Sequence, residues 1–105
     1  MMIRHIVLIR FRAEVTEAQV AAMFAELEDI RSKISGVLSI TSGRSESPEK
    51  IERGYMHGFV VDFDGWDALE AYQTYPDHKA LGTKLVAHAK GGLDGILVFD
   101  LPVHE

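Results

Sequence analysis

Residues 3–12 read IRHIVLIRFR, a run of apolar side chains with basic residues near both ends. Its β-branched and aromatic residues favour a strand. Successive side chains of a strand point to opposite faces. One face would carry His5 among large apolar groups, while the other still holds Ile6 and Leu8. The stretch therefore predicts a strand that is apolar on both sides, in a sheet that needs cover on both faces.

A helix is predicted to follow this strand. Thr16 and Gln19 match a capping box, and Gly36 suits the left-handed residue that ends a helix. A short strand is then expected over residues 37–42, and a polar, mobile loop over residues 43–54. The apolar stripe of the helix recurs at helical spacing: Val20, Met23, Phe24, Leu27, Ile30 and Ile34.

The second half of the chain predicts a strand over residues 55–63, two helices and a last strand over residues 96–101. Pro76 separates the helices, because the residue before proline avoids helical geometry and proline suits a first helical position. The inward stripes would be Trp66, Leu69 and Tyr72, then His78, Leu81, Leu85 and Ala89. The order β-α-β-β-α-α-β predicts one α+β domain over residues 1–105. Its ferredoxin-like, four-stranded antiparallel sheet would carry helices on one face.

The uncovered face of this sheet predicts a homodimer. Ile6, Leu8, Met56 and Val60 would all lie away from the helices, and the last strand is apolar on both sides. A second sheet from an identical chain is the simplest cover, through a two-fold, self-complementary contact. The alternative is that these residues are ordinary strand residues, left half exposed.

Composition excludes several classes of function. The 105 residues contain no cysteine, which rules out disulfides, thiolate nucleophiles and zinc–thiolate sites. A net charge of −5 argues against nucleic acid as a partner. The N-terminus does not resemble a signal peptide, and no apolar run is long enough to span a membrane. We therefore expect a cytoplasmic protein with no membrane partner. Nucleotide and phosphate-loop motifs are absent, and we expect no cofactor.

Histidines and a tyrosine are the candidate functional residues. His5 and His57 lie on apolar strand faces, while Tyr72 and His78 lie on inward helical stripes. A histidine near a helix N-terminus tends to stay neutral and can accept a proton, and a tyrosine hydroxyl can stabilise an oxyanion. Each could equally be a packing residue. Three converging histidines could also bind a divalent metal ion. Because no two histidines lie four residues apart on one helix beside a carboxylate, we assign no metal ligands. The cleft around them would be lined by Phe24, Leu27, Phe59, Trp66 and Leu81, and would suit a small apolar carbonyl compound.

Four segments together resemble the stress-responsive dimeric α/β-barrel (Dabb) family. They are RHIVLIRF at residues 4–11, GYMHGF at 54–59, a tyrosine followed by YPDH at 72–78, and ILVFD at 96–100. The resemblance implies a homodimer whose two sheets close into a barrel. The family includes a polyketide cyclase. Similarity to that enzyme implies that His78 is the base and Tyr72 the oxyanion donor in a cofactor-free ring closure. Many other members have no assigned chemistry.

Three functions remain open at this point. The first is a cofactor-free acid–base enzyme of the polyketide-cyclase type. The second is a non-catalytic dimer that binds a ligand or acts in a stress response. The third is a cofactor-free monooxygenase, an activity found in other ferredoxin-like dimers of this size.

Overall fold

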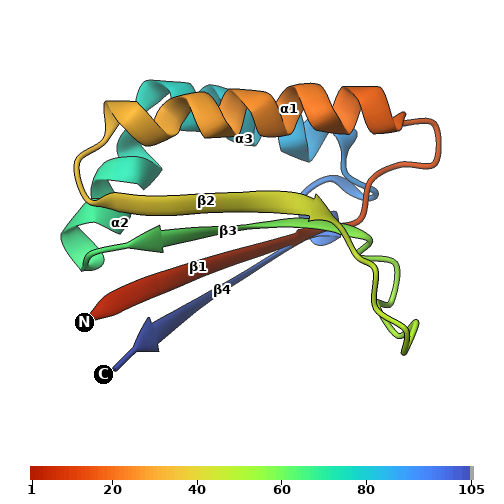
Figure 1. Cartoon of the computed structure of the whole chain (residues 1–105). Coiled ribbons are helices and arrows are strands. Elements are labelled where there is room, and N and C mark those ends of the chain that lie inside the picture. The colour runs from red at the N-terminus through yellow and green to blue at the C-terminus, as the bar shows by residue number, and fades with distance from the viewer. Residues whose placement is uncertain (105) are drawn as a thin grey trace.

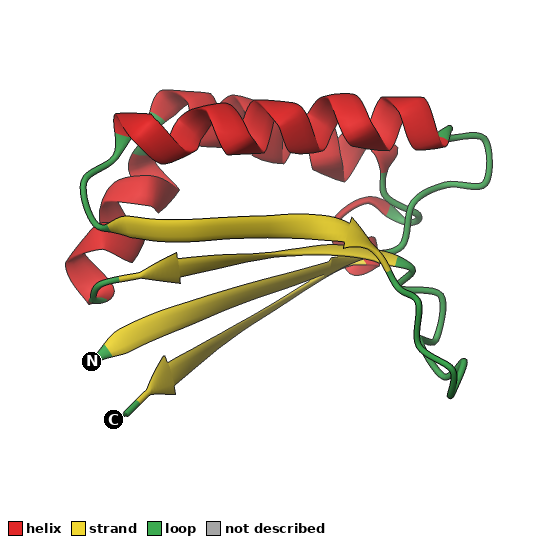
Figure 2. Cartoon of the chain, in the orientation of Figure 1, coloured by secondary structure: helices red, strands yellow, loops and turns green. Residues whose placement is uncertain are grey.

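The structure is a computed structural model that describes residues 1–104. Its four strands form one antiparallel sheet in the order β2-β3-β1-β4. Figure 1 shows the helices in a layer over one face of this sheet, and Figure 2 separates the two layers by colour. The predicted α+β, ferredoxin-like fold is confirmed. The elements are β1 (Met2–Ile9), α1 (Glu17–Ile30), β2 (Val37–Arg44), β3 (His57–Phe63), α2 (Trp66–Thr74), α3 (Pro76–His88) and β4 (Ile96–Val103), with 3-10 turns at Arg31–Lys33 and Gly92–Gly95.

The core lies between the sheet and the helix layer. In β1, Ile3, His5, Val7 and Ile9 face the helices and are at most 5% exposed. Their alternate neighbours are only half buried, as the period of a strand requires. The apolar stripe of α1 packs onto this face, and the predicted set is buried throughout: Val20, Met23, Phe24, Leu27, Ile30 and Ile34.

Both predicted helix starts are present. The Gln19 backbone N–H donates to Thr16 Oγ1 at 3.1 Å, and the Thr16 N–H donates to Gln19 Oε1 at 2.8 Å. This is the capping box at the start of α1. Pro76 is the first residue of α3, and the preceding Tyr75 is extended, with φ −67° and ψ 130°. The break between α2 and α3 is therefore built into the sequence.

Strand ends differ from the prediction. β1 ends at Ile9, because the Arg10 N–H donates to Gly95 O at 2.8 Å and Arg10 O accepts from the Lys90 N–H at 2.7 Å. The chain therefore leaves the sheet at Arg10 and bonds to the segment before β4. The last strand is longer than predicted, because β4 continues through Pro102. Proline is tolerated there because β4 is an edge strand, and proline lacks only the backbone N–H that would donate to a neighbouring strand.

The bounds of the loop between β2 and β3 also differ from the prediction. β2 runs on to Arg44 and β3 starts only at His57, so the connection covers residues 45–56. Ser45 Oγ donates to Glu52 Oε2 at 2.5 Å, and the guanidinium carbon of Arg10 lies 5.5 Å from the centre of the Tyr55 ring. The mobility of this loop stays a prediction. α1 also ends earlier, at Ile30, and Gly36 takes a left-handed φ of +90° in the turn that follows.

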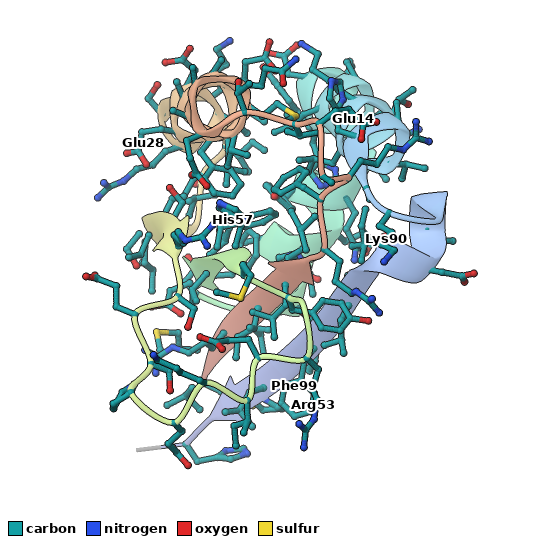
Figure 3. The ribbon with its side chains drawn as sticks, turned by 90° about the vertical axis from the view of Figure 1, so that its right-hand side faces the viewer. Glu14, Glu28, Arg53, His57, Lys90 and Phe99 are labelled. Atoms are coloured by element: carbon teal, nitrogen blue, oxygen red, sulfur yellow. The ribbon has the colours of Figure 1, made fainter. Side chains whose placement is uncertain are left out.

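The face of the sheet away from the helices is uncovered and largely apolar, although it also carries the Arg4–Asp62 ion pair. We call it the outer face, and its apolar residues are Ile6, Leu8, Val60, Leu97, Phe99 and Leu101. Phe99, opposite Ile6, is 54% exposed, and Figure 3 shows it on the side of the sheet away from the helices.

Within residues 1–104, no helix is long and apolar enough to cross a membrane.

Candidate functional site

The break between α2 and α3 brings Tyr72 and His78 together. Tyr72 lies in the last turn of α2 and His78 in the first turn of α3. Because the chain turns at Tyr75–Pro76, the two rings meet with their centres 4.1 Å apart. Tyr72 is fully buried, while His78 is partly exposed.

His5 from the sheet completes this cluster. Its ring centre lies 5.7 Å from that of Tyr72. The His5 Nδ1–H donates to Asp100 Oδ1 at 2.5 Å, since the two residues face each other across β1 and β4. In the neutral imidazole, a carboxylate at Nδ1 holds the proton there and leaves Nε2 as an acceptor. Sequence reasoning missed Asp100, although a lone carboxylate inside the apolar run ILVFDLP was a usable signal.

Two polar atoms at the centre of the cluster have no partner. Tyr72 Oη and His78 Nδ1 are both buried and make no hydrogen bond to any of residues 1–104. An unsatisfied buried polar atom costs about 1–3 kcal/mol, so such atoms are rare and call for an explanation. Here two of them occur on neighbouring rings, which sets this cluster apart from the rest of the core.

Burial sets the protonation of both groups. Desolvation raises the pKa of the Tyr72 hydroxyl well above its ordinary value, so the hydroxyl stays protonated and is available as a hydrogen-bond donor. Desolvation lowers the pKa of the His78 imidazole. A weaker backbone interaction with Gln73 opposes this shift, and nearby His5 adds to it. His78 is therefore neutral at pH 7 and can accept a proton.

A cavity of about 290 Å³ opens beside this cluster, between α3, the sheet and the turn before β4. Its walls are mainly apolar, and no lysine or arginine lines it. Tyr72 is fully buried among the rings of His5, Phe63 and His78 and is not part of the cavity lining. The lining includes His5, Phe59, His78, Gly82, Leu85 and Val98.

The other expected lining residues lie elsewhere. Leu27 and Leu81 are core residues, at most 3% exposed, and Phe24 lines a different groove. The prediction that Trp66 faces the cleft is wrong, since this side chain is 48% exposed. Two steps of three residues separate Trp66 from Tyr72, and each falls short of a full helical turn, so the two positions lie about 120° apart around α2.

His57 is also separate from the Tyr72–His78 cluster, so the expectation that it shares their cleft is wrong. It pairs with Ile9, four residues along β1 from His5. Its Nε2–H lies 3.0 Å from both carboxylate oxygens of Glu17, which also accepts from Arg44 Nη1 at 3.0 Å. The hydrogen bond from His57 lowers the pKa of Glu17. In Figure 3 His57 points into the space between α1 and the sheet, where it lines a groove of about 410 Å³.

The histidines therefore do not gather around one point. Parity along the strands placed His5 and His57 on the same face, but it could not set the distance between them. Within residues 1–104, no group of three or more histidine, aspartate or glutamate side chains is placed to hold a metal ion.

Several known proteins are similar to this chain in sequence or in fold. The olivetolic acid cyclase of Cannabis sativa is 26% identical over 82 residues, which are 78% of this chain and 81% of the cyclase. A dimeric ferredoxin-like protein of unknown function from Jannaschia superposes with a TM-score of 0.92 at 31% identity, covering 98% of this chain and 100% of that one. A hydroxynitrile lyase from Passiflora edulis shares the fold at 16% identity, with a TM-score of 0.85 over 99% of this chain and 94% of the lyase.

The family itself is defined by a model that spans nearly the whole sequence. The model of the stress responsive A/B barrel domain matches residues 3–103. This range includes every strand residue from Ile3 onward and the whole Tyr72–His78 cluster. The chain belongs to the stress responsive A/B barrel domain family.

Proposed function

We propose that the chain forms a homodimer through the outer face, and that each subunit carries a cofactor-free acid–base site for a small neutral carbonyl compound. His78 would act as the base and Tyr72 as the hydrogen-bond donor. The observation that carries the proposal is the pair of buried, unpartnered atoms, Tyr72 Oη and His78 Nδ1, beside an apolar cavity. Perturbed titratable groups next to a cavity are typical of functional sites.

The dimer accounts for the exposure of the outer face. Leu97, Phe99 and Leu101 are each more than 40% exposed in the single chain. Contiguous apolar patches of this kind typically mark an interaction surface. The solved relative from Jannaschia is described as dimeric, which supports a second copy of this chain as the cover.

The chemistry that these residues suit is proton abstraction from a carbon next to a carbonyl. Neutral His78 would take the proton, and the electron pair of the C–H bond would move onto the carbonyl oxygen. The Tyr72 hydroxyl would donate to that oxygen as negative charge develops on it. Because Tyr72 is fully buried and does not line the cavity, the side chains around it would have to move when the ligand enters.

The cavity suits an uncharged ligand. Its apolar walls stabilise carbon, and no lysine or arginine lines it to hold a carboxylate or phosphate. His5, with Nε2 left as an acceptor by Asp100, could accept a hydrogen bond from a ligand hydroxyl. The 26% identity with olivetolic acid cyclase supports the catalytic reading.

A second candidate is a dimer that binds a ligand without turning it over. The complete burial of Tyr72 favours it, because a tyrosine that never reaches the ligand contributes only packing. The two candidates differ in one measurable respect, which is the exchange of ligand protons.

Exchange of the α-protons of 2-indanone in D₂O, followed by proton NMR, tests the proposal. This flat, neutral ketone has acidic α-protons and fits the size of the cavity. We expect the chain to accelerate exchange over buffer in a saturable way. Saturable binding without exchange would favour the second candidate. If 2-indanone neither binds nor exchanges, the proposed site fails.

The pH dependence of this exchange should follow His78. Only neutral imidazole is a base, so the rate should fall as the pH drops through the pKa of His78. Because burial lowers that pKa, the midpoint should lie below the ordinary imidazole value of about 6.5. A midpoint above this value would show that another group controls the reaction.

A further inference from the structure

Gly82 lies in the interior of α3, where glycine is an unfavourable residue. No backbone strain requires it, since Gly82 is not among the glycines with positive φ. Packing does not require it either, because a Cβ built at Gly82 would meet no heavy atom within 4 Å. At Gly36, by contrast, a Cβ would lie 2.6 Å from that of Ala68. The fold alone therefore gives no reason for glycine at position 82.

The position of Gly82 in the cavity suggests a reason. It follows His78 by four residues, so the two lie next to each other on one face of α3. Leu85 and Val86 continue this face by another turn, and all four residues line the cavity. Directly beside His78, the wall of the cavity is therefore bare helix backbone.

We propose that Gly82 is a specificity-determining residue that provides a flat seat for a planar ring of the ligand. A ring can lie against the backbone at Gly82, whereas any side chain there would hold the ring away from α3. Phe59 lines the same cavity from β3, so it can contact the ring from the sheet. With the ring on Gly82, the α-carbon beside a carbonyl at the edge of the ring would lie next to His78. This inference rests on the proposed function and adds the shape of the ligand to it.

The test compares Gly82→Ala and Gly82→Leu with Thr83→Ala. Thr83 is the next residue of α3, is exposed and does not line the cavity, so it is a matched control for helix propensity. Gly82→Ala and Thr83→Ala should both raise the melting temperature, Gly82→Ala by roughly 4 °C or more, because alanine favours the helix. Only the Gly82 variants should change binding. For 5-ethyl-2-indanone, titrated by NMR, we expect Gly82→Ala to weaken binding about 10-fold or more, the scale of one methylene in an apolar pocket.

Xenon gives a readout that does not depend on the ligand class. Bound under pressure and detected by methyl shifts of Leu85 and Val86, it should occupy the wild-type cavity and be excluded by Gly82→Leu. If Gly82→Leu excludes xenon but the wild type binds no indanone, position 82 still controls the space in the cavity, and the proposed carbonyl ligand is overturned. Unchanged xenon and indanone binding in both Gly82 variants would overturn the inference about Gly82.

Discussion

Phe99→Asp should convert a dimer into a monomer. In the single chain Phe99 is 54% exposed, so aspartate there costs the isolated subunit little. In the proposed dimer the same carboxylate would be buried against the partner, once from each subunit, and the nearby cation Arg4 is already paired with Asp62. An unpaired buried charge costs about 3–5 kcal/mol, which weakens association by at least 10²-fold. Val60→Asp, on the neighbouring part of the outer face, should act in the same way.

Sedimentation at micromolar concentration measures this effect. The wild type should sediment at twice the 11.7 kDa mass of the chain, and both aspartate variants at the mass of one chain. Trp66→Asp is the control, because Trp66 is similarly exposed but lies on α2 in the helix layer. A wild-type monomer, or a dimer that survives both substitutions on the outer face, would rule out this interface.

Loss of the His78 imidazole should abolish the exchange of 2-indanone protons. His78→Ala removes the only group that the proposal assigns as base, so the rate should fall to that of buffer. Tyr72→Phe keeps the ring packing but removes the hydroxyl, and should lower the rate by about 10²-fold, the usual effect of losing one oxyanion donor. Because the Tyr72 hydroxyl has no partner to lose, its removal should leave the melting temperature unchanged or raise it.

His88→Ala is the matched control for these variants. His88 is on the same helix but outside the cavity, and its Nδ1 contacts only Lys84 O. Exchange should persist in this variant at the wild-type rate. If His78→Ala retains exchange, or if His88→Ala loses it equally, the reaction does not occur at the Tyr72–His78 cluster.

Most of the fold could be predicted from local sequence patterns. The alternation in residues 3–9 set the buried face of β1, the Thr16–Gln19 box set the start of α1, and Pro76 set the break between the two later helices. Each is a rule that acts over a few residues. Strand ends were less predictable, because β1 ends where Arg10 bonds to Gly95 and Lys90, residues far away in the sequence.

The candidate site was predictable only in part, for the same reason. The spacing across Pro76 was enough to turn Tyr72 and His78 inward. Side-chain parity could not show that the register of β1 and β3 separates His57 from His5, or that Tyr72 is absent from the cavity lining. Asp100 became visible only through its pairing with His5 across β1 and β4. These are long-range facts that depend on strand register and helix docking.

A crystal structure of the chain saturated with 2-indanone would test the central claim most directly. The account predicts the ring against Gly82, with the carbonyl oxygen within hydrogen-bond distance of Tyr72 Oη and an α-carbon next to His78. Both atoms that lack a partner would then be in contact with the ligand. A ligand bound instead in the groove between α1 and β2 near His57, or a Tyr72 that stays covered while the ligand occupies the cavity, would contradict it.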